Sequence, residues 1–227
     1  MSLILDRVDL VVARRTADRR AAGELRYRVY CEERGWEPAA QFPDGVESDA
    51  FDARATHLLL RDRATGEAAA CVRLVLCDAA DPAAPFPFEV SAVGHLDPDG
   101  DLARTPRTSL GEASRFSVAP EHRGHHGHEQ AGLSLLLAVS AAALALELGL
   151  ERVVAFSTAG TMRLLASVGL PFRRVGGFVE SHGARAAYEM TATEMLSLVD
   201  TPVTAALAWA RAELRDQVRP AVVVPAA

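Results

Sequence analysis

The hydrophobic positions of this chain fall into short runs that alternate between strand-like and helix-like spacing. Residues 3–13, 56–61 and 67–76 are rich in aliphatic residues, as β-strands are, and the polar segment 62–66 joins the last two. From 16 to 33 the apolar residues recur at helical spacing. These patterns predict a strand, a helix and a two-stranded hairpin in the first third of the chain.

The rest of the chain predicts a longer series of alternating elements. We expect strands over residues 110–118, 151–157, 172–179 and 186–191, and helices within 86–94, 130–146, 161–168 and 201–216. The stretches 34–55 and 78–108 contain recurring prolines and little periodicity, which is typical of long loops. Hairpins followed by a β-α-β unit predict a mixed sheet of α/β (α+β) class. We expect a single domain over 1–227, with its core at about 3–195 and a C-terminal helix and tail at 201–227.

The predicted strand Leu110–Val118 contains two charged residues among apolar ones. Glu112 and Arg115 are three positions apart on a strand, so we expect them to point to opposite faces, and they cannot pair with each other unless a bulge intervenes. A turn rich in glycine and histidine follows, and then comes an almost uncharged helix. Strand, glycine-containing turn and helix N-terminus is a layout that can bind a phosphate-bearing ligand. The histidines of the turn lack the spacing of a zinc site, so we expect no metal.

Charged residues in two other places need partners. The loop carboxylates of Glu47, Asp49 and Asp52 form either a solvated acidic loop or a site that recognises a cation such as an amine. Aromatic side chains near this loop in sequence, Tyr30 and Trp36, suit an ammonium or sulfonium group. Another charge, that of Arg73, lies within an apolar strand and requires a paired anion, either a loop carboxylate or Glu112.

Composition limits the classes of protein that the chain can represent. A formal net charge of −6 argues against a nucleic-acid binder that works through an overall positive field. The three cysteines match no zinc or disulfide pattern and suggest reduced thiols. The uncharged run 130–146 is rich in alanine and serine, which favours a buried helix over stable membrane insertion. Since Asp6 and Arg7 interrupt the N-terminal apolar run, we expect no signal peptide and a cytoplasmic location.

Several motifs resemble a known family. Glu112-Ala-Ser-Arg-Phe116, followed by a turn and a helix, resembles the acyl-CoA-binding motif of the GNAT acyltransferase superfamily, although Arg123-Gly-His-His-Gly127 has altered glycine spacing. Eight positions resemble, in order and nearly in spacing, the signature of acyl-homoserine lactone (autoinducer) synthases: Arg26, Tyr30, Trp36, Asp49, Asp52, Arg73, Glu112 and Arg115. Tyr30 stands where that family usually has Phe. Segments 29–36, 43–52 and 176–185 are also similar to long-chain N-acyl amino acid synthases and to PEP-CTERM/exosortase-associated acyltransferases.

The resemblance implies a fold, an activity and a donor. The fold would be a GNAT-like mixed, splayed central β-sheet flanked by helices. The activity would be transfer of a fatty acyl chain from acyl carrier protein, or from acyl-CoA, to the amine of an amino acid or related small molecule. The donor's pantetheine arm would lie along 110–118 where this strand splays from 153–157, and no cofactor would be bound permanently. Residues implied to contact the donor are Ser117, Val118, Arg123, Gly124, His125, Gly127 and Ser157.

The same resemblance implies roles in the reaction. Glu112 would be the base in thioester aminolysis, and a backbone N–H near Phe116 would bind the developing oxyanion. Apolar side chains of the second half, Phe156, Leu164, Leu165 and Phe172, would either line an acyl tunnel or belong to the ordinary core. The side chains implied to shape the acceptor pocket are Arg26, Tyr30, Trp36, Glu47, Asp49, Asp52, Arg73 and Arg115.

Other interpretations of these residues stay open. The chain resembles an acyl-homoserine lactone synthase that uses S-adenosylmethionine, in which Trp36 and the acidic loop would face the sulfonium. A second alternative is a GNAT-like module that binds an acyl ligand but does not catalyse a reaction. In each case the expected partners are an acyl carrier protein or coenzyme A thioester and a small molecule, and no nucleic acid.

Overall fold

One mixed sheet organises the chain in the computed structural model, which describes residues 2–122, 128–201 and 203–218. Its strands lie in the order β1-β2-β3-β4-β5-β8-β6, and β7 pairs with β8 beside this path. Only β4 and β5 pair in parallel, and the other described pairs are antiparallel. The strands are β1 (Val8–Val12), β2 (Ala55–Asp62), β3 (Ala68–Leu76), β4 (Leu110–Val118), β5 (Arg152–Thr158), β6 (Arg173–Arg174), β7 (Val179–Glu180) and β8 (Ala184–Thr191).

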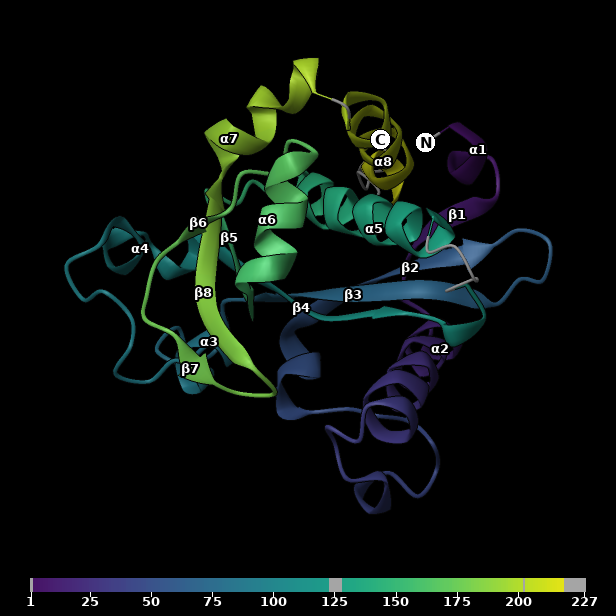
Figure 1. The fold of residues 1–227 in the computed structure, drawn as a ribbon, viewed down its shortest axis with the longest axis horizontal. Helices are drawn as coiled ribbons and strands as arrows, with labels where there is room; N and C mark the ends of the chain where they lie inside the picture. Colours follow the sequence, from purple (N-terminus) through teal and green to yellow (C-terminus); the bar gives the residue numbers. More distant parts are fainter. Residues whose placement is uncertain (1, 123–127, 202, 219–227) are drawn as a thin grey trace, which may run out of the picture.

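Helices cover both faces of this sheet (Figure 1). The α-helices are α1 (Ser2–Leu5), α2 (Thr16–Tyr27), α3 (Pro87–Ser91), α4 (Asp101–Arg104), α5 (His128–Glu147), α6 (Ala159–Ser167), α7 (Ala192–Leu196) and α8 (Thr204–Val218). A π-helical turn, η1 (Arg28–Glu33), continues α2, and short 3₁₀ turns include η3 (Ala50–Arg54). The class and sheet architecture expected from the sequence are therefore confirmed.

Alternation along the strands divides the core between the two faces. Leu58, Leu60 and Leu74 pack with α5 and α8 on one face, which we call the α5 face. Leu59 and Cys71 pack with α2 on the other, which we call the α2 face. Because α5 is apolar over most of its surface, it lies between the sheet and α8 rather than at the molecular surface. Among the described residues, none of the helices has the length and apolar character that a membrane crossing requires.

Some element boundaries differ from the sequence prediction. The expected strand 3–13 is wrong at its start, because the short helix α1 precedes β1. The helices α4 and α7 were not predicted. Both are a single turn long, and α4 forms within a proline-rich stretch where periodicity gives no signal.

The sheet opens at its centre. Leu110, Gly111 and Glu112 of β4 pair with β5, but the remaining residues of β4 have no partner there. Strand β5 instead follows β8 along its whole length, from Arg152 to Thr158. Figure 1 shows the result: β8 runs steeply across the direction of β3 and β4, so the two halves of the sheet diverge. The splay implied by the family resemblance is thus present, and it leaves a gap beside the polar half of β4.

Candidate active site

A β-bulge lies where β4 leaves β5. Cys71 and Arg73 of β3 face Ser117 and Ser114 of β4, so two β4 residues, Arg115 and Phe116, stand opposite one β3 residue. Arg115 has φ of 52°, in the left-handed region that a bulge residue adopts at some cost. The extra residue turns the Arg115 side chain to the α2 face, where Glu112 and Arg73 also lie. The prediction that Glu112 and Arg115 point to opposite faces is therefore wrong, because it assumed a regular strand.

A close approach between helix and loop brings the acidic loop to this face. Gly23 lies in the middle of α2, and its carbonyl accepts a hydrogen bond from the backbone N–H of Glu47 at 3.1 Å. A Cβ at Gly23 would come within 2.5 Å of the Val46 side chain. Glycine is therefore required here for the loop to touch the helix. Once placed, Glu47 is almost completely buried against the helix.

The next two loop carboxylates are oriented by a helix cap. Asp49 precedes η3 and accepts a hydrogen bond from the backbone N–H of Phe51 at 2.9 Å. Asp52 reaches back and accepts from the backbone N–H of Asp49 at 3.0 Å. This reciprocal capping box fixes both side chains before any arginine is considered.

Three arginines fill the space between the loop and the sheet. Arg26 donates to Glu47 and, at 2.9 Å, to Asp52. Arg73 donates to Asp52 at 2.6 Å and to Asp49 at 2.8 Å. Because Arg26 and Arg73 are only 2% and 1% exposed, these are buried ion pairs that would be costly to break.

The third arginine closes the network toward the gap. Arg115 donates to Glu47 at 3.1 Å and to Glu37 at 3.0 Å, and lies 3.2 Å from Asp49. Burial alone would raise the pKa of Asp52, but Arg26 and Arg73 hold it well below its usual range. The pKa of Asp49 is likewise lowered by Arg73 against the effect of burial. We call this cluster of three arginines and four carboxylates the ion-pair network.

Glu112 lies beside this network but is not part of it. Its carboxylate is 2% exposed and accepts a hydrogen bond of 2.7 Å from the backbone N–H of Phe88, in the first turn of α3. Burial raises the pKa of Glu112 to about 8, although the Phe88 hydrogen bond and Arg73 act in the opposite direction. At neutral pH this carboxyl group is therefore mostly protonated and is poised to exchange a proton near pH 8.

The position of α3 depends on the proline-rich loop around it. Arg107 donates to Glu89 at 2.7 Å and to the carbonyls of Pro82 and Ala84 at 2.8 Å each. Phe88 is buried under the sheet, so its N–H is held toward Glu112. The loop thus has a definite structural role that its sequence pattern did not reveal.

A cleft of about 500 Å³ passes through the gap between β4 and β5. On the α2 face its lining is polar and aromatic, and includes Glu112, Arg115 and Trp36. On the α5 face its lining is apolar, with small residues of α5 and larger side chains of α6 and β8. The apolar and small residues that line the latter part are Ala138, Ala141, Ala142, Met162, Leu164, Leu165, Phe172 and Met190.

The structure divides the expected site residues into three groups. Those that line the cleft are Tyr30, Trp36, Arg73, Glu112, Arg115, Phe116, Val118 and Ser157. Those that lie behind the lining are Arg26, Glu47, Asp49 and Asp52, which hold the ion-pair network, and Ser117, which is buried. Those outside the described residues are Arg123, Gly124, His125 and Gly127. The roles assigned to all of them stay predictions.

Sequence reasoning missed three residues of this region. Glu37 and Ser114 contact Arg115 and Arg73, at 3.0 Å in each case. His57 lies 3.5 Å from Asp52, and burial lowers the pKa of this imidazole to about 4, so it is neutral near pH 7. His57 is opposite Arg73 in the sheet register, a signal that a prediction of the strand pairing would have supplied.

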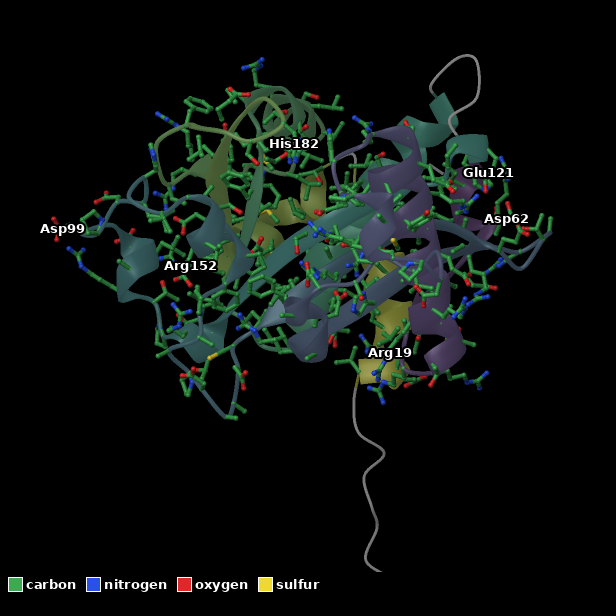
Figure 2. All side chains as sticks on the ribbon, turned by 90° about the horizontal axis from the view of Figure 1, so that it is seen from below. Arg19, Asp62, Asp99, Glu121, Arg152 and His182 are labelled. Carbon is green, nitrogen blue, oxygen red and sulfur yellow. The ribbon has the colours of Figure 1, made fainter. Side chains whose placement is uncertain are left out.

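The aromatic residues form a short chain of contacts at the mouth of the cleft. The Tyr30 hydroxyl donates to the carbonyl of Phe116 at 3.1 Å, and its ring lies 5.6 Å from that of Trp36. The Trp36 ring in turn stacks on His182 at 5.1 Å. Figure 2 labels His182, which lies on the side of the molecule away from Arg19 near the start of α2. These contacts connect the bulge of β4 to the hairpin between β7 and β8.

Comparisons with known proteins agree with this geometry. Residues 25–131, which include the ion-pair network and Glu112, match the family model of the acetyltransferase (GNAT) domain. A search of curated proteins found no match to the sequence. This part of the chain, slightly under half of its 227 residues, is therefore similar to a GNAT acetyltransferase domain.

Solved structures show the same fold at low sequence identity. TofI, in a ternary complex with an inhibitor and MTA, is 22% identical, with 87% of this chain and 99% of that chain covered and a TM-score of 0.63. The CoA-dependent acyl-homoserine lactone synthase BjaI, with SAM and isopentyl-CoA, is 20% identical, with 91% and 99% covered and a TM-score of 0.60. FeeM, an N-acyl amino acid synthase from uncultured soil microbes, is 16% identical, with 84% and 94% covered and a TM-score of 0.58.

Proposed function

We propose that the protein transfers an acyl chain from a phosphopantetheine thioester to the amine of a small molecule, with Glu112 as the general base. The observation that carries the proposal is the position of this carboxyl group. Among the described residues that line the cleft, Glu112 is the only acidic one. It lies where β4 and β5 part, and its pKa of about 8 suits proton transfer near neutral pH.

The reaction is an aminolysis. The amine nitrogen attacks the thioester carbonyl, the C–N bond forms, the C–S bond breaks, and the pantetheine thiol leaves. The proton lost by the amine passes to Glu112 and is returned to the sulfur, so that no oxidant or metal is needed. Backbone near Phe116 would hold the oxyanion, because the bulge leaves Arg115 and Phe116 without register partners on β3 or β5.

The two linings of the cleft fit the two substrates. The apolar lining on the α5 face would take the acyl chain, which supports a fatty acyl donor over an acetyl donor. The polar lining on the α2 face would take the amine. The ion-pair network would hold Arg73 and Arg115 in place rather than bind the amine through its carboxylates, since each of these carboxylates already has a guanidinium partner. The donor would be acyl carrier protein or coenzyme A.

Glu112→Gln tests the proposal. Amide for carboxylate keeps the shape and the hydrogen bond from Phe88, so we expect a normally folded protein whose rate falls at least about tenfold, and up to about 10⁴-fold. The measurement is free-thiol release from dodecanoyl-CoA, and from a dodecanoyl carrier protein, in the presence of amino acids and simple amines.

Glu151→Gln is the matched control, because Glu151 is exposed and contacts Ser109 outside the cleft. It should retain the wild-type rate. A Glu112→Gln rate equal to that of the control would remove Glu112 as the base. Binding of donor without any thiol release from the wild-type protein would instead favour the module that binds but does not turn over.

A further inference from the structure

The two arginines beside Trp36, Arg34 and Arg185, differ from those of the ion-pair network. Arg34 follows η1 and lines the cleft, and its guanidinium lies 5.0 Å from the centre of the Trp36 ring. Arg185, near the start of β8, lies at the same distance from the same ring. Two positive charges from distant parts of the sequence therefore meet at one indole.

Little negative charge balances this pair. Arg34 has an exposed glutamate, Glu33, at 3.8 Å. Arg185 has no carboxylate partner among the described residues, and its Nε is buried without a hydrogen-bond partner there. Burial lowers the pKa of Arg185, and the charge of Arg34 lowers it further. A half-buried cation that lies beside another cation and has no carboxylate partner is stabilised by an anion.

The surroundings hold this arrangement in place. His182, in the turn between β7 and β8, adopts φ of 50° and nevertheless stacks on Trp36. A non-glycine residue in this region carries strain that the surrounding contacts must offset. The hairpin that contains Arg185 is thus closed over Trp36, next to Tyr30 and the bulge of β4. An anion bound here would lie on the α2 face, where the proposed function places the amine.

We propose that Arg34 and Arg185, arranged about Trp36, bind the carboxylate of an α-amino acid acceptor. This inference rests on the proposed transfer of an acyl group to an amine. Guanidinium groups pair bidentately with carboxylates, and an α-amino acid carries its carboxylate one carbon from the nucleophilic nitrogen. The same residues disfavour a sulfonium at Trp36. The two guanidinium groups already occupy the space beside this ring, and their positive charges would repel a sulfonium.

Matched acceptor pairs test the inference. Thiol release from dodecanoyl-CoA is measured with L-phenylalanine against L-phenylalaninamide, and with L-leucine against L-leucinamide. The amides have the less basic amines and so more free base, which means that a preference for the acids reports binding of the carboxylate. We expect kcat/KM to be at least about tenfold higher for the preferred acid than for its amide.

Variants assign this preference to residues. Arg185→Gln and Arg34→Gln should raise KM for the acid at least about tenfold and leave KM for the amide nearly unchanged. Arg185→Lys should retain part of the preference, since it keeps the charge but not the bidentate geometry. Arg174→Gln is the control, because Arg174 lies 4.9 Å from the Phe178 ring rather than beside Trp36. Equal KM increases for acid and amide, or S-adenosylmethionine as the preferred acceptor, would overturn the inference.

A binding measurement separates this inference from the proposed function. Calorimetric titration of Glu112→Gln protein with L-phenylalanine and L-leucine needs no turnover. Binding that is lost in Glu112→Gln/Arg185→Gln but kept in Glu112→Gln/Arg174→Gln supports the carboxylate site even where thiol release fails. If neither amino acid binds, and the wild-type protein still releases thiol when it is given amines that carry no carboxylate, the carboxylate site is wrong. The proposed acyl transfer is then still supported.

Discussion

The two sides of the cleft differ in the chemistry of the side chains around them. On the α2 face, buried and half-buried charged side chains from four segments meet in the ion-pair network, and each needs its partners. On the α5 face, mostly small and apolar side chains of α5, α6 and β8 leave space, and no charged side chain of these three elements lines it. The ion-pair network on the α2 face therefore tolerates few substitutions, because each one leaves a charged group without its partner. On the α5 face, substitutions change the volume of the cleft by small steps.

The largest expected effect breaks the polar side. Arg73→Met removes a buried guanidinium that pairs with Asp49 and Asp52, and leaves carboxylates partly buried without it. We expect a loss of about 3–5 kcal/mol in the free energy of unfolding, measured by urea titration. Arg20→Met, which removes an exposed pair with Glu24 on α2, should cost less than about 1 kcal/mol. Similar losses in both variants would mean that the buried network contributes no more than a surface pair.

The next effect concerns proton transfer on the polar side. Since burial raises the pKa of Glu112 to about 8 and the base works when deprotonated, kcat/KM should rise about tenfold from pH 7 to pH 9. Glu112→Gln should lack this rise and retain only the dependence caused by the amine itself. A pH profile that is unchanged by the substitution would assign the titration to the substrate.

The same group makes stability depend on pH. Folded Glu112 keeps its proton between about pH 4.5 and 8, whereas in the unfolded chain it is ionised there. Its contribution to stability is therefore present at low pH and is lost as pH rises through this window. Glu112→Gln should lose less stability than the wild type over this range in thermal unfolding.

A smaller and more selective effect is expected on the apolar side. Ala138 of α5 is half-buried and lines the cleft, so Ala138→Leu reduces its volume. We expect kcat/KM to fall about tenfold more for dodecanoyl-CoA than for acetyl-CoA, because only the long chain needs the space. The same change at exposed Ala208 of α8 is the control. Equal losses for both donors would place the acyl chain elsewhere.

The smallest expected effect concerns Tyr30, which contacts the bulge of β4 between the two sides of the cleft. Tyr30→Phe removes the hydrogen bond to the carbonyl of Phe116 at the bulge and keeps the ring beside Trp36. We expect a loss of about 1 kcal/mol in unfolding free energy, and a smaller loss of activity than with Glu112→Gln. An activity loss as large as that of Glu112→Gln would show that the bulge geometry, rather than the base, limits the reaction.

The sequence by itself determined most elements of the fold and which residues are exceptional. Strand β4 matches its predicted bounds, since apolar residues at strand spacing lie between clear turn signals. Charged residues such as Arg73 and Glu112 were recognisable because they interrupt apolar strands, and their resemblance to a family signature grouped them before any contact was known. These are local properties that each segment carries in its own composition.

Only the tertiary structure decided how those residues meet. The bulge that turns Arg115 to the α2 face depends on the pairing of β4 with β3, and the loop contact at Gly23 depends on helix and loop packing together. The meeting of Arg34 and Arg185 at Trp36 joins segments about 150 residues apart. Register, bulges and ion pairs between distant segments arise from packing the whole sheet at once, so no local pattern specifies them.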